Sequence, residues 1–190
     1  GASKGEGLGN KFLENIRQTD AIVHVVRAFD DDDITHVTGK VDPVDDIDTI
    51  NLELIMADLD SVNNRLAKVQ RAAKGRDKDA LAELAVLEKL KPVLEAGKPA
   101  RSVEFSAEEM PIVKGLFLLT IKPVLYVANV AEDDMANPEA SKYMDVIKEH
   151  VAGDGEVIGI AAAAEEQIAE MDEEEKADFL EIGRASCRER

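Results

Sequence analysis

Short apolar runs and helical patterns alternate along most of the chain. The apolar runs are rich in β-branched residues and predict buried strands at residues 21–29, 123–128 and 156–160. Helical patterns are found at residues 10–17, 106–117, 143–151 and 161–181. Buried strands that alternate with helices favour an α/β fold with a parallel sheet. In such a sheet, ligands bind beyond the carboxyl ends of the strands.

Two of the predicted helices carry local signals. Phe12, Leu13 and Ile16 give the first of them an apolar face. Ser106 and Glu109 have the spacing of a capping box, in which each side chain accepts a hydrogen bond from the backbone N–H of the other residue. The sequence therefore predicts that a helix begins close to residue 106.

A long insertion interrupts the alternation. Apolar residues recur at intervals of three and four, which is the pattern of a coiled-coil seam. The residues of this seam are Leu52, Ile55, Leu59, Val62, Leu66, Val69 and Ala73. Gly75 ends the seam, and a second helical stripe follows at Leu81, Leu84, Leu87, Leu90 and Leu94. Two helices joined by a short polar turn predict an antiparallel coiled-coil hairpin.

The turn of this hairpin is basic in an acidic chain. Residues 61–80 carry six basic side chains, namely Arg65, Lys68, Arg71, Lys74, Arg76 and Lys78. Only Asp77 and Asp79 oppose them. This basic tip is explained either by a solvated helix face or by a contact with phosphates, such as those of ribosomal RNA.

The charge of the whole chain narrows the choice of partners. Its 190 residues include 23 basic and 40 acidic ones, for a net charge of −17, which discourages broad contact with nucleic acid or an anionic membrane. No apolar run approaches the roughly 18 residues of a spanning helix. Aromatic residues make up 4%, which argues against base stacking on an aromatic platform. The chain has a single cysteine, Cys187, and so cannot form an internal disulfide, which fits a reducing cytoplasm.

A polar pair ends the second predicted strand. Asn129 follows the apolar run, and Glu132 comes three residues later in the pattern N-x-x-E. The two side chains could cap the next turn, or they could read the edge of a nucleotide base. The pattern alone is weak, because about one chance match is expected in a chain of this length.

Catalytic and metal-binding residues are not evident. His24 lies inside an apolar run and is expected to be a packed core histidine. The acidic residues 30–33 favour a solvated loop, because nothing nearby completes a set of metal ligands. The sequence contains no G-x-x-x-x-G-K-S/T phosphate loop, and the Gly-rich residues 5–10 lack its Lys–Ser/Thr pair. We predict no catalytic and no metal-binding residue on this chain.

Several segments together resemble the YchF, or Obg-like ATPase, family of the Obg-related P-loop NTPases in the TRAFAC class. GASKGEGLGNKFL is similar to the segment after the DxxG motif of switch II, and TDAIVHVVRAF resembles the following strand. GKVDPVDDIDTINLELIMADLD resembles the entry to the family's inserted helical hairpin, and KDALAELAVLEKL resembles its return helix. LTIKPVLYVANVAED is similar to the base-recognition strand. The resemblance covers residue 1 to about residue 180.

The resemblance implies a P-loop NTPase-type sheet with an inserted antiparallel coiled-coil hairpin. Residues 1–46 and 101–180 would belong to the nucleotide-binding domain, and residues 47–100 would form the hairpin. Residues 181–190 look like a translated sequencing adapter. The phosphate loop, switch I and the DxxG aspartate would precede residue 1, and a TGS domain would follow residue 180. The chain alone is therefore not expected to hydrolyse ATP.

The resemblance also implies roles for particular residues. The family's N-x-x-E is associated with ATP, so Asn129 would brace the loop and the backbone of Val130 would meet the base edge. Glu132 would contact the adenine amino group or hold the loop. Ala161 and Ala162 match a second base-side loop, whose backbone N–H donors are expected to remain available to the base.

The remaining implications concern the switch, the cofactors and the partners. Gly5, Gly7 and Gly9 would form a switch II flank that adjusts to the γ-phosphate. ATP and Mg²⁺ would be bound, with the metal ligands upstream of residue 1, and the ribosome would be the partner in the cytoplasm, with no membrane and no DNA involved. Two alternatives remain open. One is a hairpin module that binds the ribosome or RNA without relevant nucleotide binding, and the other is an Obg-like GTPase, against which the missing N-K-x-D argues.

Overall fold

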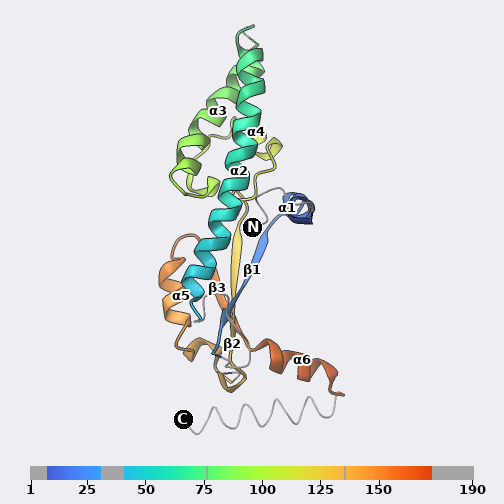
Figure 1. Cartoon of the computed structure of the whole chain (residues 1–190), viewed down its shortest axis with the longest axis vertical. Helices are drawn as coiled ribbons and strands as arrows, with labels where there is room; N and C mark the ends of the chain where they lie inside the picture. Colours follow the sequence, from blue (N-terminus) through green and yellow to red (C-terminus); the bar gives the residue numbers. More distant parts are fainter. Residues whose placement is uncertain (1–7, 31–40, 76, 135, 173–190) are drawn as a thin grey trace. The chain divides into compact units, whose positions relative to one another are not determined.

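The chain divides into two compact units in the computed structural model (Figure 1). The residues that the structure describes are 8–30, 41–75, 77–134 and 136–172. We call residues 1–22 and 48–123 the hairpin unit, and residues 23–47 and 124–190 the sheet unit. Among the described helices, none is both long enough and apolar enough to cross a membrane.

The hairpin unit is helical. Its elements are α1 (Leu8–Arg17), α2 (Pro43–Ala73, whose first five residues belong to the sheet unit), α3 (Lys78–Glu95), the 3₁₀ turn η2 (Ala100–Ser102) and α4 (Met110–Gly115). Helix α2 begins four residues before residue 47, where the hairpin is predicted to start. Asp42 caps it by accepting the Asp45 N–H at 3.2 Å, and Pro43 suits a first helical position because it has no N–H to leave unpaired.

The hairpin of α2 and α3 confirms the predicted seam over most of its length. Ile55, Val62, Leu66 and Val69 are buried against α3, with Leu59 and Ala73 partly buried beside them. The prediction is wrong for Leu52, which is 51% exposed. Helix α3 has only 18 residues, so an antiparallel partner extends back from the turn only to about residue 55.

The predicted leucine stripe of α3 is wrong at its first residue. Leu87, Leu90 and Leu94 are buried, but Leu81 is 46% exposed and Ala80 is buried in its place. Leucines spaced by three residues rotate steadily around a helix, so Leu81 lies about 180° from Leu90. The predicted stripe therefore could not have kept all five leucines on one face.

A buried carboxylate joins the helices of the hairpin unit to a loop. Asp58 on α2 is fully buried and accepts the backbone N–H groups of Leu119 and Thr120, at 2.9 and 2.7 Å. The Thr120 hydroxyl donates to it at 2.7 Å, and Arg17 of α1 donates to it at 3.2 Å. Four donors therefore compensate the charge that burial takes out of water.

The capping box is confirmed. The Ser106 N–H donates to Glu109 Oε2 at 2.8 Å, and the Glu109 N–H donates to Ser106 Oγ at 3.2 Å. Hydrogen bonding from Lys89 lowers the pKa of Glu109. Helix α4 itself begins at Met110, just after the box, and Pro111 lies in its first turn.

Among the described residues, three strands form one sheet in the order β1 (Ile22–Ala28), β2 (Val124–Val130) and β3 (Gly155–Ile160), and all of them except Ile22 belong to the sheet unit. Strands β2 and β3 are parallel, in a register that runs from Val124 opposite Gly155 to Asn129 opposite Ile160. Two 3₁₀ turns, η3 (Glu132–Asp134) and η4 (Pro138–Ala140), and helix α5 (Met144–His150) connect them. Helix α6 (Ala162–Glu170) follows β3. The predicted α/β class is confirmed. Of the helical pattern predicted at residues 161–181, the part after residue 172 lies outside the described residues.

Only the middle strand is as buried as the sequence predicts. Tyr126 and Ala128 of β2 are fully buried, whereas Val23 and Val25 of β1 are each 61% exposed and Ile158 of β3 is 42% exposed. The prediction of buried strands is therefore wrong for one face of β1 and β3. These strands are the outer ones of the described sheet, and an apolar run does not reveal whether both faces of its strand are covered.

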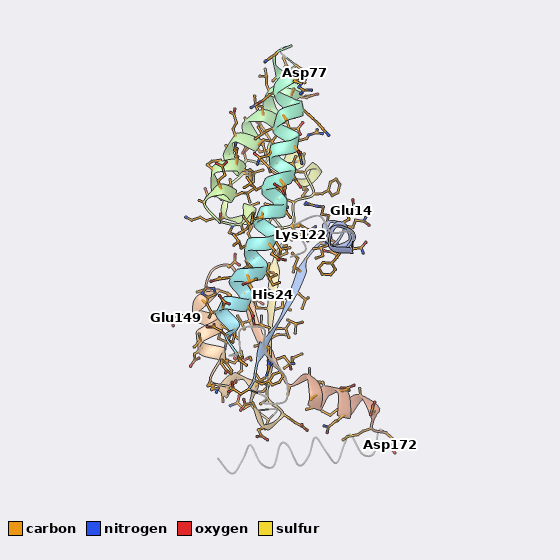
Figure 2. The ribbon with its side chains drawn as sticks, in the orientation of Figure 1. Glu14, His24, Asp77, Lys122, Glu149 and Asp172 are labelled. Carbon is orange, nitrogen blue, oxygen red and sulfur yellow. The ribbon has the colours of Figure 1, made fainter. Side chains whose placement is uncertain are left out.

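His24 on β1 packs as expected (Figure 2). Its ring lies 5.4 Å from that of Tyr126, centroid to centroid. Burial lowers the pKa of His24, although the charge of Asp46 opposes this shift. His24 therefore packs against Tyr126 in the sheet unit, although it is half-buried and not fully enclosed in the core.

Candidate nucleotide-base site

The parallel pairing of β2 and β3 brings two predicted base-side segments together. Asn129 lies opposite Ile160, the last residue of β3, and Ala161 follows directly. The N-x-x-E segment and the alanine loop thus leave the sheet at the same edge. This edge is the carboxyl end of both strands, where α/β sheets bind their ligands.

The side chain of Asn129 links the two segments. Its Oδ1 accepts the Ala162 N–H at 2.9 Å. Ala162 is the first residue of α6, and the N-cap residue Ala161 makes no side-chain cap hydrogen bond. Since the first N–H groups of a helix lack partners within the helix, Asn129 supplies a cap from the neighbouring strand.

This bond differs from the sequence expectation in one respect. The Ala162 N–H is engaged within the protein, so it is not available to a base as the alanine loop predicted. Ala161 is buried and Ala162 is half-buried. In this structure, the alanine loop fixes the start of α6 against β2.

Glu132 lies beyond the strand, in the 3₁₀ turn η3, and is exposed. Its Oε1 accepts a hydrogen bond from Nε2 of Gln167 on α6 at 3.0 Å. Val130 ends β2 with its side chain buried. The sequence did not predict a role for Gln167, because no pattern in α6 distinguishes it from the neighbouring polar residues Glu165 and Glu166.

Asp30, the first residue of the acidic run, lies just beyond β1. It forms an ion pair with Lys142 and accepts the Tyr143 hydroxyl at 2.7 Å. The hydrogen bond from Lys142 is the main cause that lowers the pKa of Asp30, and the bond from Tyr143 adds to it. The rest of the acidic run lies outside the described residues, and so do Gly5 and Gly7 of the predicted switch flank. Gly9 lies in the first turn of α1.

The basic tip belongs to the hairpin unit, where Asp77 caps α3 (Figure 2). Arg65 is paired across the hairpin with Glu83, and a second guanidinium nitrogen donates to that carboxylate at 3.0 Å. The hydrogen bonds that Arg65 donates to Glu83 raise the pKa of Arg65. Arg76 lies outside the described residues. The other basic residues of the tip are exposed, and they are Lys68, Arg71, Lys74 and Lys78.

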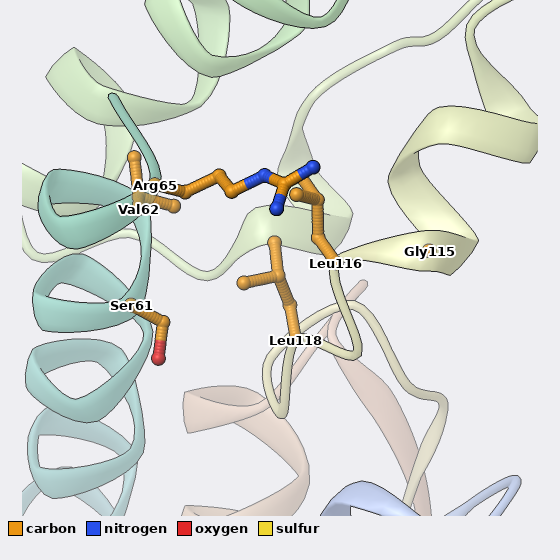
Figure 3. Close-up of a pocket in the computed structure, with 6 residues that line it drawn as sticks. All are labelled: Ser61, Val62, Arg65, Gly115, Leu116 and Leu118. Atoms are coloured by element: carbon orange, nitrogen blue, oxygen red, sulfur yellow. The ribbon is translucent and has the colours of Figure 1, made fainter. Parts of the chain in front are cut away.

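A pocket in the hairpin unit also includes Arg65 (Figure 3). It is lined by Ser61, Val62, Arg65, Gly115, Leu116 and Leu118. None of the residues predicted to contact a base lines it. Its arginine is already engaged by Glu83, so the pocket does not change the assignment of the candidate site.

Comparison with known proteins agrees with the resemblance. No protein-family model matches the chain. The chain is 59% identical over 182 residues to the ribosome-binding ATPase YchF of Bacillus subtilis, in a match that covers 95% of this chain and 50% of that protein. It is 54% identical over 182 residues to the ribosome-binding ATPase YchF of Haemophilus influenzae, covering 95% of this chain and 49% of that protein.

A solved structure has the same fold. The structure of the Schizosaccharomyces pombe YchF GTPase superposes with a TM-score of 0.82 at 36% identity, covering 97% of this chain and 51% of that one. The sheet, its inserted hairpin and this match define an α/β protein of the P-loop NTPase type. The chain spans about half the length of the curated relatives it matches. Over the residues that it spans, it belongs to the YchF family.

Proposed function

We propose that the chain supplies the base-recognition side of an adenine-nucleotide site, within a protein that hydrolyses ATP to ADP and phosphate and associates with the ribosome. The observation that carries the proposal is the bond from the Ala162 N–H to Asn129 Oδ1, which joins the two base-side segments at the edge of the sheet. Relatives named as ribosome-binding ATPases support the reaction and the partner.

The preference for adenine rests on the chemistry of the polar pair. In N-K-x-D proteins, the aspartate accepts from the ring N–H and amino group of guanine, and adenine has a lone pair in place of that ring N–H. Here Val130 replaces the lysine, and Glu132 is one methylene longer than aspartate. The Schizosaccharomyces pombe relative is named a GTPase, so the preference for adenine is proposed from this polar pair alone.

Mg²⁺ would neutralise phosphate charge during hydrolysis. The described residues include no group of three acidic, histidine or cysteine side chains arranged to hold a metal ion. The carboxylate of Asp30 is engaged by Lys142 and Tyr143. We propose that the metal ligands lie in the part of the relatives' length that this chain does not span.

The hydrolysis of ATP and GTP in the presence of Mg²⁺ tests the proposal. A protein with the length of the curated relatives should turn over ATP faster than GTP. The 190-residue chain, which contains no G-x-x-x-x-G-K-S/T, should turn over neither. If the purified chain, freed of contaminating ATPase, hydrolyses ATP, then it supplies more than the base-recognition side of the site and the proposal is wrong.

A second candidate function uses the hairpin alone. The exposed cations Lys68, Arg71 and Lys74 favour contact with RNA phosphates in a chain that is otherwise acidic. In this case the chain would dock on the ribosome without relevant nucleotide binding. Ribosome association that persists when the protein binds no nucleotide would support this alternative.

A further inference from the structure

Gln167 lies where it can control the carboxylate of Glu132. It is on α6, 35 residues away in sequence, and its Nε2 donates to Glu132 Oε1 at 3.0 Å. Both side chains are exposed, so neither is held by burial. Their position depends instead on the Asn129–Ala162 bond, which fixes the start of the same helix against the same segment.

The chemistry of the surrounding residues makes Gln167 distinctive. Turn η3 consists of Glu132, Asp133 and Asp134, and Glu165 and Glu166 precede Gln167 on α6. Ionised carboxylates accept hydrogen bonds but cannot donate them. Gln167 is a neutral side chain among these acids, and its amide can donate to Glu132 without adding charge.

We infer that Gln167 is a specificity-determining positioning residue, which holds the Glu132 carboxylate so that its second oxygen accepts from the amino group of adenine. This inference rests on the proposed function. The first oxygen is occupied by the Gln167 amide, and Oε2 keeps its acceptor capacity. Adenine carries an amino donor where guanine carries a carbonyl acceptor, so a fixed acceptor there favours adenine and opposes guanine.

Without the bond from Gln167, the Glu132 carboxylate could adopt other orientations. A carboxylate free to rotate can also accept from the ring N–H and amino group of guanine, as the aspartate of N-K-x-D does. The bond from Gln167 therefore contributes to selectivity by limiting the orientations of Glu132. The residue acts through Glu132 and need not contact the nucleotide.

Equilibrium binding of ATP and GTP to a protein with the length of the curated relatives tests this role. Gln167→Ala should narrow the ratio of ATP to GTP affinity by about tenfold, the equivalent of one hydrogen bond. Gln167→Glu should narrow it further, because two carboxylates would then face each other. Glu166→Ala removes the exposed neighbouring side chain, and this control should leave the ratio unchanged.

A double variant separates positioning from a merely structural role. In Glu132→Gln combined with Gln167→Glu, the amide at position 132 would donate to the carboxylate at 167 and direct its carbonyl oxygen outward. An acceptor would again face the base, so the double variant should recover ATP selectivity relative to Gln167→Glu alone. Circular dichroism of each variant checks that the fold is intact.

The binding results test the role of Gln167 separately from the proposed function. If the unmodified protein prefers ATP and the ratio is the same in Gln167→Ala, Gln167→Glu and the double variant, the role of Gln167 is wrong and the proposed function stands. If the unmodified protein binds GTP more tightly, or binds neither nucleotide, the proposed function fails and the inference fails with it.

Discussion

The amide of Asn129 lies between the ends of two parallel strands and accepts the first N–H of α6. This single bond ties the end of strand β2 to the loop after β3. An alanine in the N-cap position cannot supply that acceptor, so the strand residue does. N-x-x-E can be interpreted either as a cap for a turn or as a motif that reads a nucleotide base. The cap that Asn129 provides does not exclude the second interpretation, because the same bond holds the two predicted base-side segments together.

Replacing Asn129 measures what this bond contributes. Asn129→Ala leaves the half-buried Ala162 N–H without its partner and should lower the free energy of unfolding by about 1 kcal/mol. Asn129→Asp keeps an acceptor, in a place where negative charge suits a helix N-terminus, and should lose less. Urea unfolding of the 190-residue chain gives both values, and equal losses would mean that the bond does not contribute.

Asn129 and Glu132 could be singled out from the sequence because a strand-ending polar pair has a known pattern. Gln167 could not, because its significance depends on η3 and α6 lying side by side, and no spacing rule connects residues 132 and 167. The engaged Ala162 N–H was missed for the same reason. Local patterns identify candidate groups, but the pairing of groups is decided by tertiary structure.

At the scale of elements, Asp58 is the point where α1, α2 and the loop before β2 meet. It accepts from Leu119, from both the backbone and the side chain of Thr120, and from Arg17. Arg17 also donates to Ser61 Oγ at 3.0 Å and to the Phe117 carbonyl at 2.9 Å. These bonds, with the small cluster of Leu13, Ala57 and Leu119, pack α1 onto α2.

Removing the carboxylate should therefore be costly. Asp58→Ala would leave the Leu119 and Thr120 N–H groups buried and unpaired, and should reduce the free energy of unfolding by about 3 kcal/mol or more. Asp60→Ala is the matched control, because Asp60 is exposed two residues further along the same helix. Urea denaturation of both variants makes the comparison. A loss below 1 kcal/mol for Asp58→Ala would contradict the role assigned to it.

The hairpin shows how far periodicity predicts an element. The intervals from Ile55 to Ala73 identified the helix and its buried face, because regular packing against one partner leaves a regular pattern. Asp58 escaped the same reasoning, since a charged residue in a helical pattern is expected to face solvent. Its burial depends on a loop about 60 residues later in the chain, whose donors it meets.

At the scale of the whole molecule, charge is unevenly distributed. The chain has a net charge of −17, yet the exposed residues Lys68, Arg71, Lys74 and Lys78 gather at the tip of the hairpin. Arg65 is already paired with Glu83, so it contributes less to a phosphate contact than the sequence suggests. A contact made by the tip should weaken as salt is raised.

Charge reversal tests the tip. Lys68→Glu, Arg71→Glu and Lys74→Glu together should abolish co-sedimentation of the full-length protein with ribosomes while ATP binding is retained. The control reverses Lys98 and Lys114, two exposed lysines of the hairpin unit outside the tip, and should sediment normally. Unchanged sedimentation of the tip variant would remove the tip from the ribosome contact.

We propose that the polar pair at the end of β2 selects adenine for an ATP-hydrolysing protein. The most direct measurement is the steady-state hydrolysis of ATP and GTP, side by side, by a protein with the length of the curated relatives, in the presence of Mg²⁺. We expect faster turnover of ATP. Faster turnover of GTP, or turnover of neither nucleotide, would contradict it.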